Sequence, residues 1–115
     1  AGKWNHQQIV PESWIDFNLG LAPALMNQDA PEPKELASYG AQWWLNRPNP
    51  RKQLTKEIPK APDNLFFGSG HHGQFLAVFP DQQLILVRNG NDKKESINRA
   101  ELFSLAYEVS RKDLK

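Results

Sequence analysis

The chain has 115 residues, which is the length of one ordinary domain. Its 14 Lys and Arg against 13 Asp and Glu leave a formal net charge of +1, which argues against a general nucleic-acid binder. The absence of Cys excludes disulfides and thiolate metal sites, and no apolar run approaches the roughly 20 residues that span a bilayer. We therefore expect residues 1–115 to form a soluble single domain or fragment that binds neither nucleic acid nor membrane.

The N-terminal third predicts one helical region followed by a loop. Residues 4–22 form a helical region with a preceding turn, in which Pro11 suits a first helical position and Glu12 complements the positive helix start. Gly20 and Pro23 are expected to end it. Residues 23–38 are predicted to be a loop, because the prolines within them interrupt regular structure. The first residue is Ala1 and not Met, so we expect a processed product, an expressed piece or a segment of a longer chain.

The middle of the chain predicts a strand and then a long basic loop. Residues 39–45 (YGAQWWL) alternate as a single strand, with Tyr39, Ala41, Trp43 and Leu45 on one face. Residues 46–63 carry several Lys and Arg among prolines but no interleaved aromatic residues. That composition favours a solvated loop over a phosphate or nucleic-acid site.

Residues 65–90 predict an antiparallel meander of three strands. The first begins at residues 65–67, and the second and third cover residues 74–79 (QFLAVF) and 84–88 (LILVR). Residues 68–73 (GSGHHG) form a tight connection, and residues 80–83 form a turn. Since LILVR is apolar on both faces, we expect this strand to be central or covered on both sides.

The C-terminal segment predicts a helix that covers one face of the sheet. Asn98 is the expected N-cap, with Glu101 three residues later as in a capping box. The apolar stripe consists of Leu102, Leu105, Ala106 and Val109, widened by Phe103 and Tyr107. The predicted class is therefore α+β, an antiparallel sheet of three to four strands flanked by a C-terminal and an N-terminal helix.

The glycine-rich segment over residues 68–73 is the main candidate for chemistry. It lacks the Lys-Ser/Thr pair and following helix of a P-loop, and adjacent His71 and His72 on a strand would point to opposite faces. We therefore expect no metal site and no cofactor. A tight turn that uses the conformational freedom of glycine explains the segment by itself. The functional alternative is a backbone that a substrate approaches closely, with free N–H groups directed at it.

Four motifs in order resemble the C-terminal part of the serine β-lactamase-like hydrolases. This superfamily contains class C β-lactamases, penicillin-binding proteins, related esterases and 6-aminohexanoate-dimer-type amidases. The motifs are KWN with QIVPESW over residues 3–14, YGAQWW over 39–44, FFGSGHHGQ over 66–74, and the proline of residue 80 followed by LILVR. The resemblance covers most of the chain and implies the C-terminal portion of the β-lactamase-like fold.

The resemblance implies an active-site strand within residues 68–74. In the family, a Lys-Thr-Gly or His-Thr-Gly box is followed by a residue whose N–H completes the oxyanion hole. The preferred register places Gly68-Ser69-Gly70 on the box and His71 on the donor, which makes Ser69, Gly70 and His71 the catalytic residues expected in this chain. A second register places residues 71–73 on the box, with Gln74 as donor. Gly68 departs from the family's cation, which favours an esterase or amidase over a β-lactamase.

Substrate-binding residues are expected on the same wall and on the neighbouring strand. They are His72, Gly73, Gln74 and Trp44, although aromatic pairs such as Trp43-Trp44 more often line a core or a cleft. The family's nucleophilic Ser, its Lys and its catalytic Tyr would lie upstream, because no Ser-x-x-Lys occurs in the chain. The chain alone is therefore expected to be inactive.

The expected partner is the N-terminal part of the same hydrolase, and the expected substrate is a small ester or amide. Without that part, a sheet edge or face would stay open, which predicts self-association or modest stability. The parent would be periplasmic or secreted. Two alternatives remain: a non-catalytic binding module that retains this half-fold, and an autonomous hydrolase in which His71 or His72 activates Ser69.

Overall fold

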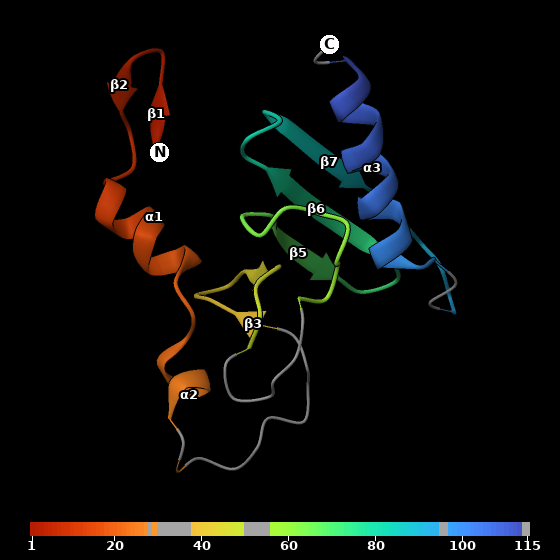
Figure 1. Cartoon of the computed structure of the whole chain (residues 1–115), viewed down its shortest axis with the longest axis horizontal. Coiled ribbons are helices and arrows are strands. Elements are labelled where there is room, and N and C mark those ends of the chain that lie inside the picture. Colours follow the sequence, from red (N-terminus) through yellow and green to blue (C-terminus); the bar gives the residue numbers. More distant parts are fainter. Residues whose placement is uncertain (28, 30–37, 50–55, 95–96, 114–115) are drawn as a thin grey trace.

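The computed structural model describes residues 1–27, 29, 38–49, 56–94 and 97–113. Their elements are, in chain order, β1 (Lys3–Trp4), β2 (Gln7–Gln8), α1 (Glu12–Leu19), α2 (Pro23–Met26), β3 (Ser38–Tyr39), β4 (Trp44–Leu45), β5 (Phe66–Gly70), β6 (Gln74–Phe79), β7 (Leu84–Arg88) and α3 (Arg99–Asp113). β1 and β2 form a hairpin, and β3-β4-β5-β6-β7 form an antiparallel sheet in that order. α3 lies against one face of this sheet (Figure 1). The predicted α+β class is confirmed.

The sheet has five strands, and the expectation of three to four is not confirmed. Residues 39–45 were expected to form one strand, but the chain reverses inside them. Gln42 has a φ of 72°, and the Gly40 amide donates a hydrogen bond to the Trp43 carbonyl at 2.8 Å. β3 and β4 are therefore a short hairpin, with Tyr39 paired to Trp44. A single strand over this segment is wrong, because a left-handed residue in its middle turns the backbone.

The hydrophobic core lies between α3 and one face of the sheet. Phe103 of α3 is fully buried, and its ring centroid lies 5.2 Å from Phe67, 5.7 Å from Phe75 and 6.4 Å from Phe79. These three partners share a face because side chains alternate along β5 and β6. The prediction that this helix covers the sheet is confirmed, and the Asn98 side chain accepts a hydrogen bond from the Glu101 amide at 3.2 Å as its N-cap.

The predicted apolar stripe of α3 is only partly correct. Leu105 and Val109 were placed in it, but they are 58% and 50% exposed. Phe103, expected only to widen the stripe, is the residue at its centre. Helical periodicity identifies an apolar sector, but the crossing of the helix over the sheet decides which part of that sector is covered.

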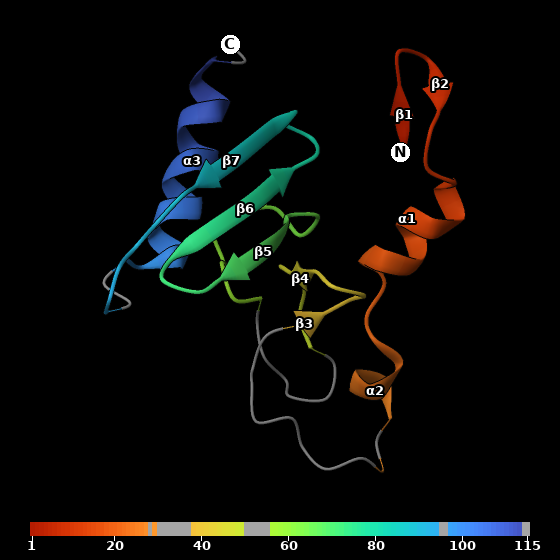
Figure 2. The same ribbon diagram turned by 180° about the vertical axis from the view of Figure 1, so that it is seen from behind.

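The N-terminal arm, defined as residues 1–26, extends beside the sheet (Figure 2). Its helix α1 ends at Leu19, with Gly20 as C-cap as predicted, but it begins at Glu12, so that Pro11 is its N-cap and not its first helical residue. Residues 3–8 form the β1–β2 hairpin and are not helical. Pro23 begins α2 and does not start a loop. The rest of the predicted loop, residue 28 and residues 30–37, lies outside the described residues. α1 buries none of its side chains.

β7 has the predicted bounds but not the predicted environment. It pairs with β6 on one side, and within the described residues it has no strand on the other side. Ile85 and Val87 are 63% and 61% exposed on the sheet face that α3 does not cover. The expectation that this strand is central or covered on both sides is therefore wrong for the described chain.

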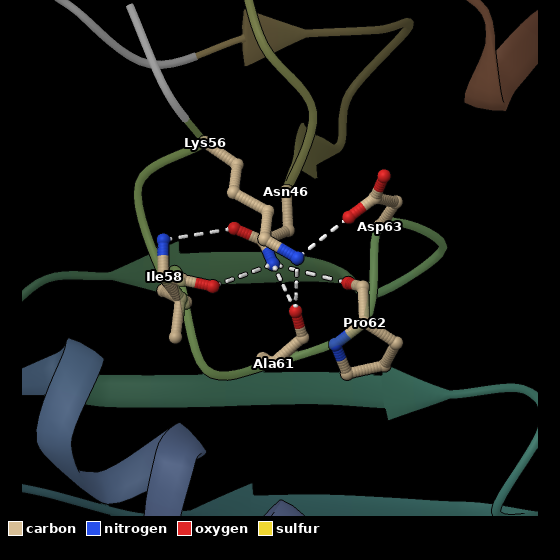
Figure 3. Close-up of polar contacts among 6 residues, drawn as sticks. All are labelled: Asn46, Lys56, Ile58, Ala61, Pro62 and Asp63. Atoms are coloured by element: carbon tan, nitrogen blue, oxygen red, sulfur yellow. Dashed lines mark hydrogen bonds and ion pairs between the residues drawn. The ribbon is translucent and has the colours of Figure 1, made fainter.

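The loop after β4 is organised by the buried side chain of Asn46 (Figure 3). Its amide nitrogen donates to the carbonyls of Ile58, Ala61 and Pro62 at 3.0, 3.3 and 3.0 Å, and its oxygen accepts from the Ile58 amide at 2.9 Å. Lys56 contacts the Ala61 carbonyl and the Asp63 carboxylate, both at 2.6 Å. These bonds join the described parts of this basic loop to each other, and Ile58 and Ala61 belong to the hydrophobic core. Residues 50–55 lie outside the described residues.

Among the described helices, none combines the length and the apolar character that a bilayer crossing requires.

Candidate functional site

The hairpin formed by β5 and β6 brings most of the predicted site residues together. Its two strands pair from Phe66 opposite Val78 to Gly70 opposite Gln74, and residues 71–73 make the turn. The segment predicted as a connection over residues 68–73 is therefore shorter, because β5 continues through Gly70. Ser69 through Gln74 consequently occupy one end of the sheet.

The two histidines of the turn lie against each other. Their ring centroids are 3.7 Å apart at an interplanar angle of 30°. The expectation that they point to opposite faces is wrong, because they belong to the turn and His72 has a left-handed φ of 58°. In the part of the chain that the structure describes, there is no cluster of three or more His, Asp or Glu side chains arranged to hold a metal ion.

The outer edge of β5 is free along its last three residues. Within β5, only Phe66 and Phe67 pair with β4. In the described chain, residues 68–70 therefore extend past β4 and have no neighbouring strand on that side. On the uncovered sheet face, this edge borders a hollow of about 420 Å³ whose lining includes Gly68, Gly70 and Gln74. A free backbone edge next to a hollow can accept an extended ligand or present an amide to it.

The glycines of this segment have different structural requirements. Gly73 has a φ of 76°, and a Cβ there would lie 2.6 Å from Nη1 of Arg88 and 2.8 Å from Oδ2 of Asp92. At Gly68, by contrast, an added Cβ would meet no atom within 4 Å, and φ is not in the left-handed region. The conformational freedom of glycine therefore explains Gly73 but not Gly68. Instead, the missing side chain of Gly68 leaves open space on the sheet face that α3 does not cover.

On the helix-covered face, Ser69 belongs to a charged cluster. Nη1 of Arg99 donates to Ser69 Oγ at 3.1 Å, and Nε of Arg99 donates to Glu57 Oε1 at 2.9 Å. The guanidinium also lies 5.0 Å from the centroid of the Phe67 ring. Arg99, Ser69 and Glu57 line a cavity of about 360 Å³, together with Gly70 and Asp92. Ser69 Oγ thus accepts a hydrogen bond from an arginine, and among the described residues this is its one side-chain hydrogen bond.

A second ion pair secures the turn to the segment that follows β7. Nη2 of Arg88 lies 2.9 Å from Oδ2 of Asp92, and Nη1 of the same residue donates to the Gly73 carbonyl. The Asp92 amide donates to the His72 carbonyl at 3.1 Å. Contacts from the Arg88 side chain on β7 and from the Asp92 backbone after it therefore hold the 71–73 turn.

Trp44 is the one predicted site residue that the fold does not bring to this hairpin end. It packs on the hydrophobic core, and its ring meets Tyr39 edge-on at 4.7 Å. Its backbone pairs with Phe67, at the opposite end of β5 from the turn. Of the two interpretations weighed for the Trp43-Trp44 pair, core packing fits Trp44.

Four charged residues near the site were not predicted: Glu57, Arg88, Asp92 and Arg99. Glu57 and Arg99 are 42 residues apart in the sequence. No spacing rule links such a pair, and only the packing of α3 on β5 joins them. The Arg88–Asp92 pair has a separation of four residues, but this is a helical signal and the segment is a strand end.

No protein-family model matches the sequence, and no curated protein matches it significantly. The resemblance to serine β-lactamase-like hydrolases therefore stays a prediction based on the four motifs.

Proposed function

We propose that the chain is the C-terminal part of a serine hydrolase of the β-lactamase-like superfamily. It would contribute one active-site strand, β5, and one backbone amide to amide or ester hydrolysis. The observation that carries this proposal is the free edge at residues 68–70, where Gly68 leaves space that the fold itself does not require. The four motifs of the resemblance supply the class of reaction.

In this proposal, the catalytic groups are divided between this chain and an upstream part of the same enzyme. In the complete enzyme, an upstream Ser would attack the carbonyl carbon, and upstream Lys and Tyr would carry its proton to the leaving group. In the preferred register, Gly70 would end the box and the His71 backbone would supply the amide that follows it. A backbone donor of this kind stabilises the oxyanion by about 3 kcal/mol. The bond that breaks is the ester or amide bond, and water then releases the acyl group.

Exposed apolar side chains are consistent with a larger protein around this chain. On the N-terminal arm, Trp4, Trp14 and Phe17 are 72%, 57% and 59% exposed. Apolar surface of this extent on a small domain is typical of contact regions.

The test begins with the coding sequence upstream of Ala1 and the protein that it encodes. We expect Ser-x-x-Lys followed by Tyr-x-Asn or Tyr-x-Ser, labelling of the parent by a fluorophosphonate probe, and hydrolysis of p-nitrophenyl butyrate. An upstream region without these motifs, in a parent that the probe does not label, would overturn the proposal.

A paired substitution in the active parent tests the role of β5. Gly68→Val adds a branched side chain beside the free edge, where this chain offers space for it. We expect kcat/KM to fall by about tenfold or more, since small displacements of reacting groups are costly. Lys60→Val, on an exposed loop residue, is the matched control and should leave kcat/KM unchanged. Equal kcat/KM values for the two variants would show that β5 is not part of the active site.

A second candidate, a non-catalytic binding module, is favoured by the charged cavity beside Ser69. That cavity is lined by the Arg99–Glu57 pair and by Asp92, which suit a small polar ligand. This candidate predicts saturable ligand binding by the isolated chain and no upstream nucleophile. Isothermal titration with small carboxylates and amines would distinguish it from the hydrolase segment.

A further inference from the structure

The free edge of β7 is flanked by exposed apolar side chains on both faces of the sheet. On the face that α3 does not cover, Ile85 and Val87 are 63% and 61% exposed. The backbone groups along the outer side of a five-residue edge strand are available for pairing. Within the described chain, no bulge or second strand blocks this edge.

The other face continues the same surface into a groove between β7 and α3. The groove encloses about 320 Å³ and is lined by Leu84, Leu86, Leu102, Leu105, Ala106 and Val109, with Ser110 at its end. Leu105 and Val109 are the exposed members of the helix stripe that the core leaves uncovered. The edge and the groove together form one apolar strip around β7.

We propose that a second copy of this chain occupies the strip, through antiparallel pairing of β7 with β7 about a two-fold axis at Leu86. In this register Ile85 faces Val87 of the second copy, and Val87 faces its Ile85. β-branched residues directly opposite each other on one sheet face are a favourable cross-strand pair. The strand is therefore complementary to itself on the uncovered face, as an isologous interface requires.

The charges on α3 suit the same arrangement. A two-fold axis perpendicular to the sheet places the two α3 helices on one face, running in opposite directions. The first turn of α3 carries Glu101 beside Arg99, which is paired with Glu57, and its last turn carries Arg111 and Lys112 before Asp113. An antiparallel helix pair thus brings the acidic end of one copy near the basic end of the other. The net charge of +1 per chain imposes little repulsion.

This inference is independent of the proposed hydrolase function. It concerns the isolated chain, and it stands or falls whether or not the parent contains an upstream nucleophile. An upstream strand of a parent hydrolase would compete for the same edge, so the dimer is tested on residues 1–115 alone and the hydrolase activity on the parent.

The mass of the chain in solution is the first test. Multi-angle light scattering across about a hundredfold range of concentration should approach twice the monomer mass of 13.1 kDa. The double variant Ile85→Lys with Val87→Lys should raise the dimer dissociation constant by about a hundredfold or more, because like charges would face each other. Ile9→Lys is the matched control, since Ile9 is 57% exposed on the N-terminal arm. This control should leave the dimer intact.

The wild-type chain provides a second test that needs no substitution in the strip. In a mixture of isotope-labelled and unlabelled chains, filtered NMR should detect contacts between the methyl groups of Ile85 and Val87 across the interface. A monomer at all concentrations would overturn the proposal. So would a dimer that lacks these contacts, or one that Ile9→Lys disrupts and the double variant does not, since the interface would then lie elsewhere.

Discussion

Arg99 at the start of α3 directs Nε and Nη2 to the same carboxylate oxygen of Glu57, across 42 residues of chain. Its third nitrogen, Nη1, reaches Ser69 on β5. One guanidinium therefore joins the helix, the loop that follows β4 and the strand that we propose for the active site. The two side chains are 29% and 25% exposed, so solvent only partly screens the pair.

Arg99→Ala should lower the free energy of unfolding by about 1–2 kcal/mol, because it leaves Glu57 half-buried without its partner. Arg99→Lys keeps the charge but not the forked geometry, so its free energy of unfolding should lie between those of Arg99→Ala and the wild type. Urea denaturation measures both. A change below about 0.3 kcal/mol in Arg99→Ala would show that this pair does not secure the cluster.

Asn46→Ala should cost about 3 kcal/mol of stability. The substitution removes four hydrogen bonds from a fully buried side chain, leaves the Ile58 amide without its acceptor and takes one donor from each of three carbonyls. Asn46→Asp should be no better, since a carboxylate cannot donate to those carbonyls. Asn91→Ala, on an exposed residue, is the control and should change stability by less than about 0.5 kcal/mol. Equal melting curves for Asn46→Ala and Asn91→Ala would contradict the prediction.

Gly73→Ala and Gly68→Ala form a matched pair within one hairpin. Gly73→Ala should destabilise the chain by about 1–3 kcal/mol, because its φ is 76° and an added Cβ meets Arg88 and Asp92. Gly68→Ala should be neutral or slightly stabilising, since nothing lies within 4 Å of its added Cβ. Thermal unfolding followed by circular dichroism compares the two. A larger loss of stability in Gly68→Ala than in Gly73→Ala would contradict the left-handed conformation assigned to Gly73.

Phe103→Ala should lower the free energy of unfolding by about 3–5 kcal/mol, which is typical when a fully buried aromatic ring is lost. This ring joins α3 to β5 and β6 through Phe67, Phe75 and Phe79. Phe17→Ala is the control of the same residue type, because Phe17 is 59% exposed on α1 and should cost less than about 1 kcal/mol. A small effect of Phe103→Ala in urea denaturation would place the core elsewhere.

Regular elements with a strong local signal could be predicted from the sequence. β6 and β7 have the predicted bounds, and Asn98 caps α3 as its spacing to Glu101 indicates. Such features depend on neighbouring residues, so a short window of sequence contains their cause. The same reasoning gave a wrong prediction for residues 39–45. Their alternation over seven residues predicts one strand, and few local residues indicate the turn at Gln42.

The candidate site likewise contains residues whose position local sequence predicts and one whose position it does not. The position of Ser69, Gly70 and Gln74 at one hairpin end follows from the glycine-rich segment between two apolar runs. Trp44 lies away from that hairpin end, because its position along β5 depends on strand register. Register between β4 and β5 is set by packing over a separation of more than 20 residues, which no local pattern encodes.

The sequence by itself determined the class of fold, the meander of β5, β6 and β7, and the helix that covers it, because hydrophobic periodicity and capping act over a few residues. Only the tertiary structure decided that Arg99 meets Glu57 and Ser69, that Asn46 is buried inside its loop, and that β7 lies at an edge. These three facts depend on contacts between segments far apart in the chain. Their energies arise only when the sheet and α3 have packed together, so no stretch of sequence contains them alone.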